Sequence, residues 1–300
     1  MWSYAPLYYK NFKCIADRCT HSCCVGWEID VDGQTLTRYR AETSAAGEML
    51  RRGLVQDGER AHFALCADGR CPHLQQNGLC EIIATLGEGY LCDICREHPR
   101  FYNLQGVRME CGLGASCEEA ARLILETADY RTLCLVEELD IETEEWEITP
   151  HEVRDELLAL LANHRLSYAE RLRSIGEKCG VSLPVWGDIQ ATVGALEYLD
   201  EAHRQLLTGL AEPPAVTGER ASLCERFLAY LLYRHTGGAQ TRDEFCEAVG
   251  FALATERLFC ALLCGGMSPV KAAVLLSEEI EYSEDNTAAV RDAVARNGQI

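Results

Sequence analysis

The chain has 300 residues, of which 28 are basic and 47 acidic, and its formal net charge is −19. A hydrophobic content of 48% is enough for a packed core in one or two domains and excludes a disordered chain. The acidity argues against a nucleic-acid partner, because binding phosphates requires clustered lysine and arginine side chains.

Charge and cysteine are unevenly distributed along the chain. Residues 1–117 carry 12 basic and 14 acidic side chains and 11 of the 17 cysteines, whereas residues 118–300 carry 16 basic and 33 acidic side chains. The N-terminus lacks the apolar stretch of a secretory signal, and no segment approaches the roughly 20 apolar residues of a membrane span. We therefore expect a cytoplasmic protein without membrane contact, in which reduced thiols bind a metal rather than form disulfides.

The first part of the chain is predicted to contain short elements broken by glycine and cysteine. Strands are expected at Val25–Val31 and Phe101–Met109, and a helix at about Thr35–Leu54. The glycines in Leu86–Tyr90 are expected to end a helix rather than to bind a nucleotide, which argues against a Rossmann fold. Because long apolar runs are few, this part is expected to depend on metal ligands for its stability.

The second part reads as a series of helices with recognisable start signals. Ser116–Glu119 fits a capping box and is expected to open a helix that continues through Cys134 and Leu135. Further helix starts are expected at Thr149–Pro150, Ser222–Glu225, Thr241–Glu244 and Ser268–Pro269, with exposed connections at Glu142–Thr149 and Glu212–Gly218.

The fold class follows from these two patterns. We predict a mainly α protein in which residues 1–126 form a cysteine-rich metal-cluster domain with a few short strands. Residues 127–300 are predicted to form an acidic, all-α helical domain.

The cysteines of the first part fall into three cassettes. These are Cys14-x4-Cys19-x3-Cys23-Cys24, Cys66-x4-Cys71 with Cys80, and Cys92-x2-Cys95, and they are followed by Cys111 and Cys117. Ligation by thiolates alone selects zinc or iron–sulfur over magnesium or calcium. The adjacent Cys23 and Cys24 fit poorly as two corners of one zinc tetrahedron, whereas an iron–sulfur cluster offers separate iron corners. The spacing favours an iron–sulfur cluster and leaves zinc open.

The remaining cysteines and the histidines have more ordinary interpretations. Cysteines among the apolar residues of predicted helices are interpreted as core residues: Cys134, Cys179, Cys224, Cys246, Cys260 and Cys264. Histidines beside cysteines are secondary ligand candidates, since thiolates suffice: His21, His73 and His98. The other histidines are interpreted as surface or capping residues: His151, His164, His203 and His235.

Three segments together resemble the flagellin lysine N-methylases. They are FKCIADRCTHSCCVGWEIDVDGQTLTRY, CPHLQQNGLCEIIATLGEGYLCDICREHPRF and MECGLGASCEEAARLIL, and ERFLAYLLYRH is similar to a later helical signature of that family. The first two cassettes are also similar to the iron- or zinc-binding proteins of YkgJ type. By this resemblance Cys66, Cys92 and Cys111 are extra, and the family's cysteine positions are Cys14, Cys19, Cys23, Cys24, Cys71, Cys80, Cys95 and Cys117.

The resemblance implies an enzyme that transfers a methyl group from S-adenosylmethionine to flagellin lysines and carries a [4Fe-4S] cluster. A contiguous radical-type Cys-x3-Cys-x2-Cys motif is absent, so a radical mechanism is not transferred to this chain. Candidate cofactor-binding residues are Arg96, His98 and Arg100, which would contact the cofactor's carboxylate, and Glu110, which would accept a proton. An alternative role for the two arginines is pairing with acidic helices.

Two other functional classes stay open at this point. The chain is alternatively a non-catalytic iron–sulfur or zinc module that senses metal or oxidants and binds a partner through its helices. A structural zinc domain joined to a helical interaction domain is the third possibility.

Overall fold

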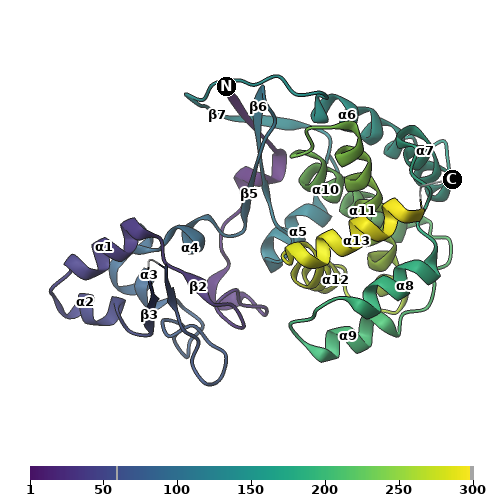
Figure 1. Cartoon of the computed structure of the whole chain (residues 1–300). Coiled ribbons are helices and arrows are strands. Elements are labelled where there is room, and N and C mark those ends of the chain that lie inside the picture. The colour runs from purple at the N-terminus through teal and green to yellow at the C-terminus, as the bar shows by residue number, and fades with distance from the viewer. Residues whose placement is uncertain (59, 298–300) are drawn as a thin grey trace. The chain divides into compact units, whose positions relative to one another are not determined.

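The computed structural model describes residues 1–58 and 60–297 and is mainly α-helical, which confirms the predicted fold class (Figure 1). Two compact units are distinguished by their internal contacts. Unit 2 is Lys13–Arg100, and unit 1 combines Met1–Phe12 with Phe101–Ile300. This division differs from the expected boundary at residue 126, because the N-terminal strand pairs with strands that follow residue 100.

Unit 2 is a small α/β unit around a modest apolar core. Its strands form one sheet in the order β2 (Ile29–Asp30), β4 (Arg60–Phe63) and β3 (Leu54–Asp57). Its helices are α1 (Gly33–Ala41), α2 (Ala45–Leu50), α3 (Glu81–Leu86) and α4 (Asp93–Glu97). The side chains of Tyr39, Leu50 and Phe63 are fully or almost fully buried.

Two expected elements of unit 2 are shorter than the sequence suggested. The helix expected at Thr35–Leu54 is two helices, because Ser44 caps α2 by accepting a hydrogen bond from the N–H of Ala46 at 3.2 Å. The strand expected at Val25–Val31 is reduced to β2, while Val25 makes an isolated bridge to Arg70. Gly87 adopts φ +86° directly after α3, so the expected helix end is confirmed there.

Unit 1 contains a sheet in the order β5 (Arg100–Leu104), β6 (Arg108–Leu113), β1 (Trp2–Pro6) and β7 (Leu133–Glu138). The strand expected at Phe101–Met109 is therefore two strands, β5 and β6. The expectation that a helix continues through Cys134 and Leu135 is wrong, and so is the expectation that residues 127–300 are all α. These two residues lie in β7 and pair with Ala5 and Tyr4 of β1, which supplies the backbone partners that an isolated strand lacks.

The helices of unit 1 pack around two long central ones, and several start where the sequence signals predicted. They are α5 (Glu118–Glu126), α6 (Pro150–Leu161), α7 (Tyr168–Cys179), α8 (Trp186–Ala195), α9 (Glu201–Thr208), α10 (Gly218–Thr236), α11 (Arg242–Cys264), α12 (Pro269–Leu276) and α13 (Glu284–Asn297). Proline occupies the first turn of α6 and α12 as predicted, and Thr241 forms the predicted capping box of α11.

Two of the predicted start signals are wrong. Cys117 stands at the N-cap of α5, and the hydroxyl of Ser116 has no hydrogen-bond partner within the described ranges, so the predicted capping box does not form. Helix α10 begins at Gly218, one turn before the expected start at Ser222.

The core of unit 1 lies between α10 and α11. Phe227 of α10 stacks on Phe259 of α11 with ring centroids 4.2 Å apart, and both are fully buried. Along the described chain, no helix combines the length and the apolar character that crossing a bilayer requires.

A buried ion pair joins the sheet of unit 1 to α6. Arg154 donates two hydrogen bonds of 2.6 Å to the two carboxylate oxygens of Glu110, and both side chains are buried. Arg108 and Gln105 also donate to this carboxylate. Burial alone would raise the pKa of Glu110, but Arg154 and Arg108 hold it below its ordinary value.

Removing one partner of this pair is expected to destabilise unit 1 strongly. Glu110→Ala leaves Arg154 as an unpaired buried charge. The free energy of unfolding of unit 1 should therefore fall by about 3–5 kcal/mol. The control is Glu126→Ala, which removes the exposed partner of Arg122 and should change stability by about 0–1 kcal/mol. Urea unfolding followed by circular dichroism measures both, and equal losses would contradict the stabilising role of the buried pair.

A π-helical turn at Ser277–Glu281 buries acidic side chains that no sequence pattern had identified. Glu281 accepts hydrogen bonds from His235 at 2.6 Å and Tyr230 at 3.0 Å. His235 is therefore not a surface or capping residue as predicted, because its ring is almost completely enclosed. Burial alone would raise the pKa of Glu281, but Arg234 and His235 lower it to about 2.

This lowered pKa predicts an acid-sensitive contribution to stability. Ionised Glu281 stabilises the fold fully above its unfolded-state pKa of about 4.3, and the contribution, roughly 3 kcal/mol, is lost as the pH falls towards 2. Glu281→Gln should therefore flatten the fall in melting temperature between about pH 5 and pH 2. The exposed Glu284→Gln serves as control and should keep the wild-type slope. An unchanged slope in Glu281→Gln would refute the assignment.

Candidate metal centre

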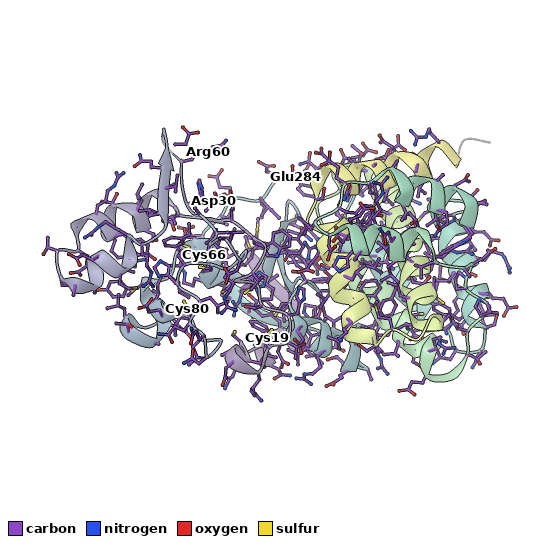
Figure 2. The ribbon with its side chains drawn as sticks, turned by 90° about the horizontal axis from the view of Figure 1, so that it is seen from below. Cys19, Asp30, Arg60, Cys66, Cys80 and Glu284 are labelled. Atoms are coloured by element: carbon purple, nitrogen blue, oxygen red, sulfur yellow. The ribbon has the colours of Figure 1, made fainter. Side chains whose placement is uncertain are left out.

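The thiols of unit 2 gather where loops and short helices meet its apolar core. Cys80 and Cys92 stand at the N-caps of α3 and α4, and Cys95 lies within α4. The N–H of Cys71 donates to the carbonyl of Cys24 at 2.8 Å, which ties the first cassette to the second. Cys92 is buried, and Cys80 and Cys95 pack against the same core (Figure 2 labels Cys80).

Five of these thiols share one electrostatic neighbourhood. Cys71 interacts with Cys24, Cys80 and Cys92, and Cys95 interacts with Cys92, Cys24 and Cys71. Cys92 and Cys95 are hydrogen-bonded to each other. The structure therefore brings together four of the predicted ligands with Cys92, which the family resemblance had set aside as extra.

Burial works against ionisation of these thiols when no cation is present. It raises the pKa of Cys71 to about 11 and also raises that of Cys80. In contrast, the hydrogen bond with Cys23 lowers the pKa of Cys24 despite its burial, and Arg70 acts in the same direction. Since thiolates are the metal-binding form, a bound cation would replace protons at Cys71 and Cys80.

The donor atoms of unit 2 bear on the kind of metal. Thiols are soft donors, which suit zinc or an iron–sulfur cluster. A zinc tetrahedron with Zn–S bonds of about 2.3 Å places its sulfur atoms roughly 3.8 Å apart. Within residues 1–58 and 60–297, three donors lie within 4.8 Å of one another at Cys224, Glu256 and Cys260, which belong to unit 1.

The remaining predicted ligands are Cys14, Cys19, Cys23 and Cys117, of which Cys23 is hydrogen-bonded to Cys24. Cys14 accepts from the N–H of Ala16 at 3.4 Å, and Cys19 donates to the carbonyl of His21 at 2.9 Å. Cys117 belongs to unit 1, where it packs against the apolar core. The extra cysteines differ from one another, because Cys66 is exposed and Cys111 is buried in β6.

His73 is the histidine most closely associated with the second cassette. It is 1% exposed, packs edge-to-face on Phe63 with ring centroids 4.7 Å apart, and has an Nε2 atom without a partner among the described residues. Burial lowers the pKa of His73 to about 4, so the ring is neutral at pH 7.

The predicted cofactor-binding residues are distributed over both units. Arg96 in α4 forms ion pairs with Asp93 and Glu97, and Arg100 donates to the carbonyl of Arg96 at 3.4 Å. His98 directly follows α4. Glu110 lies in unit 1, where both of its oxygens accept from arginine side chains. The pairing of Arg96 agrees with the alternative that these arginines bind acidic groups, although its partners lie in its own helix.

Comparison with known proteins finds similarity to a flagellar biosynthetic protein and to two lysine-N-methylases. The chain is 28% identical over 134 residues to the flagellar biosynthetic protein FliU of Salmonella muenchen, a match that covers 43% of this chain and 79% of that protein. It is 27% and 26% identical over 134 residues to proteins named lysine-N-methylase from Salmonella choleraesuis and Salmonella typhimurium. These matches confirm the resemblance to the flagellin lysine N-methylases.

The similarity is partial in length. The match spans about a third of each lysine-N-methylase, 33%, and again 43% of this chain. No family model matches the sequence, so the similarity to YkgJ-type proteins stays a prediction. No solved structure matches either.

The gathered thiols predict which substitutions remove metal. Cys71→Ala and Cys92→Ala should each lower the iron bound per chain by more than half and destabilise unit 2, because both thiols interact with the other members of the group. Cys66→Ala is the matched control, since it lies in the same unit but is exposed. Iron and sulfide are measured after anaerobic purification, and equal loss in Cys66→Ala would contradict this grouping.

Proposed function

We propose that this chain takes part in methylating lysine side chains of flagellin in the cytoplasm, with S-adenosylmethionine as the methyl donor and a [4Fe-4S] cluster in unit 2. The observation that carries the proposal is the similarity to two proteins named lysine-N-methylase. The gathering of thiols in unit 2 supports the cluster part independently of those names.

The proposed cluster ligands are Cys24, Cys71, Cys80 and Cys95, four cysteines that the sequence had marked and that lie in one neighbourhood. Cys92 lies beside Cys95 and is the alternative fourth ligand. When bound, such a cluster supplies one-electron redox chemistry and cross-links the loops that hold it. The chain's own contribution is to present thiols from three cassettes against one core.

The proposed reaction is a polar methyl transfer. The neutral ε-amine of lysine forms a bond to the methyl carbon while the carbon–sulfur bond of the sulfonium breaks, and S-adenosylhomocysteine leaves. The amine must first lose its proton to water or a base, because its pKa is ordinarily about 10.4. The acidic surface of the chain favours approach of a lysine-bearing substrate.

The cofactor's carboxylate is proposed to be contacted from the segment that follows α4. Arg100 and His98 are the proposed contacts there, and Arg96 pairs with two carboxylates in its own helix. Glu110 has less support as a proton acceptor, since Arg154 and Arg108 keep it ionised and occupied.

The test is a methyl-transfer assay with anaerobically purified full-length chain, flagellin and S-adenosylmethionine carrying a labelled methyl group. Label should enter flagellin lysines, as located by mass spectrometry, and Cys71→Ala should reduce the initial rate at least tenfold while Cys66→Ala leaves it unchanged. A cluster-replete protein that binds no S-adenosylmethionine by calorimetry and transfers no label would overturn the proposal. Cluster without cofactor binding would favour the metal- or oxidant-sensing module instead.

A further inference from the structure

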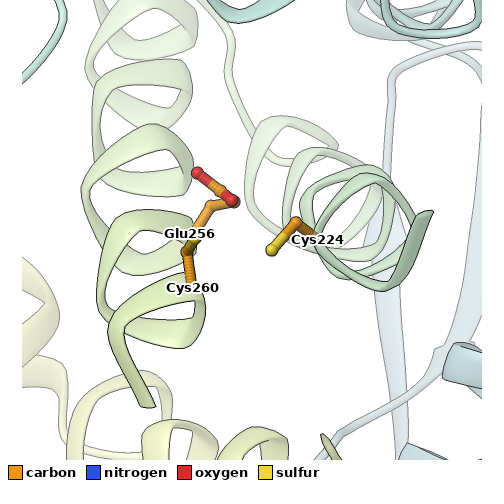
Figure 3. A group of neighbouring side chains, drawn as sticks. All are labelled: Cys224, Glu256 and Cys260. Atoms are coloured by element: carbon orange, nitrogen blue, oxygen red, sulfur yellow. The ribbon is translucent and has the colours of Figure 1, made fainter. Parts of the chain in front are cut away.

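A second group of metal-binding side chains lies in unit 1, far along the sequence from the cysteine cassettes. Cys224 of α10 faces Glu256 and Cys260 of α11 (Figure 3). One donor atom from each residue lies within 4.8 Å of the other two. None of these residues belongs to the proposed iron–sulfur centre.

The packing of α10 on α11 brings these side chains together for a simple geometric reason. Glu256 and Cys260 are four residues apart, so they project from the same face of α11. That face packs on α10, whose Cys224 is completely buried. Glu256 is 1% exposed and Cys260 is 5% exposed, so all three donors are enclosed in the helical core.

The carboxyl group of Glu256 is only partly compensated in this core, where the side chains of Tyr168 and Cys224 hydrogen-bond with it. Its Oε1 atom has no hydrogen-bond partner in the described part of the chain. Arg257 acts on it electrostatically, but the Arg257 guanidinium pairs with Glu212 at 2.7 Å. Leaving the buried Oε1 atom without a partner costs free energy, which a bound cation would offset.

The donor set identifies the chemistry of the ion. Two thiols with one carboxylate suit zinc, which binds sulfur at about 2.3 Å and carboxylate oxygen at about 2.0–2.2 Å. Magnesium and calcium prefer all-oxygen sites, so the thiols disfavour them. Cys264 lies one turn further along α11, and its thiol hydrogen-bonds with that of Cys260, which supplies a candidate fourth donor.

We propose that Cys224, Glu256 and Cys260 bind a zinc ion that fastens α10 to α11. From the sequence, both cysteines were interpreted as core residues, because nothing in the spacing of positions 224 and 260 shows that two helices bring them together. The ion replaces the proton on each thiol and on the carboxyl group, so three protons are released, and its two positive charges offset two of the three negative charges that form.

The experiment measures zinc and iron separately in the full-length chain by elemental analysis. Glu256→Gln and Cys260→Ser should each lose one equivalent of zinc and leave iron unchanged. Cys134→Ser, in β7 of the same unit, should keep that zinc, and so should Cys71→Ala in unit 2. Because zinc binding is read without methyl transfer, a failed methylation assay does not affect this result.

A second measurement covers the case in which a substitution prevents folding. Zinc K-edge X-ray absorption of Cys71→Ala, in which the wild-type unit 1 donors are intact, should report two or three sulfur ligands at about 2.3 Å together with oxygen at about 2.0–2.2 Å. A folded wild-type chain without zinc would overturn the proposal, and so would zinc bound by sulfur alone or retained in folded Cys260→Ser.

Discussion

A polar side chain that is removed from water needs a partner, and both units of this protein bury several such groups. In unit 1 arginine supplies the partner, since Arg154 donates hydrogen bonds to both carboxylate oxygens of Glu110. It is met again at Glu281, which Arg234, His235 and Tyr230 surround. Glu256 departs from this pattern, since the nearby Arg257 pairs with Glu212 instead.

In unit 2 the buried groups that need a partner are thiols. Its apolar core includes Tyr39, Leu50 and Phe63, and the thiols of Cys80, Cys92 and Cys95 pack with these side chains. Buried thiols are tolerated as neutral groups, but burial raises the pKa of Cys71 to about 11, so their ionised form requires a cation. A metal centre would therefore contribute to the folding of this unit as well as to its chemistry.

The parts of the fold that follow from local physics were predictable from the sequence. Thr241 and the two prolines at the starts of α6 and α12 act within one helical turn, so their roles are visible in a few adjacent residues. The pairing of β7 with β1 joins residues about 130 positions apart, and no local pattern encodes it. For the same reason Cys134 and Leu135 were assigned to a helix.

The site was predictable to a similar extent and with similar limits. The cassettes contained Cys24, Cys71, Cys80, Cys92 and Cys95, and the family resemblance kept all of these except Cys92, which the fold places in the same neighbourhood. The burial of Cys92 at the N-cap of α4 was the missing information, since exposure cannot be read from spacing. Two residues separate Cys92 from Cys95 in a CxxC pattern, and that local signal was available in the sequence.

Different parts of the fold hold the two thiol groups of this chain. The donors at Cys224, Glu256 and Cys260 come within 4.8 Å of one another, a distance that a single ion can bridge, and two packed helices hold them. The thiols of unit 2 come from three cassettes and interact electrostatically across loops and short helices. The proposed zinc ion and the proposed cluster would therefore occupy separate units of one chain, and they would select different metals although both sites use cysteine.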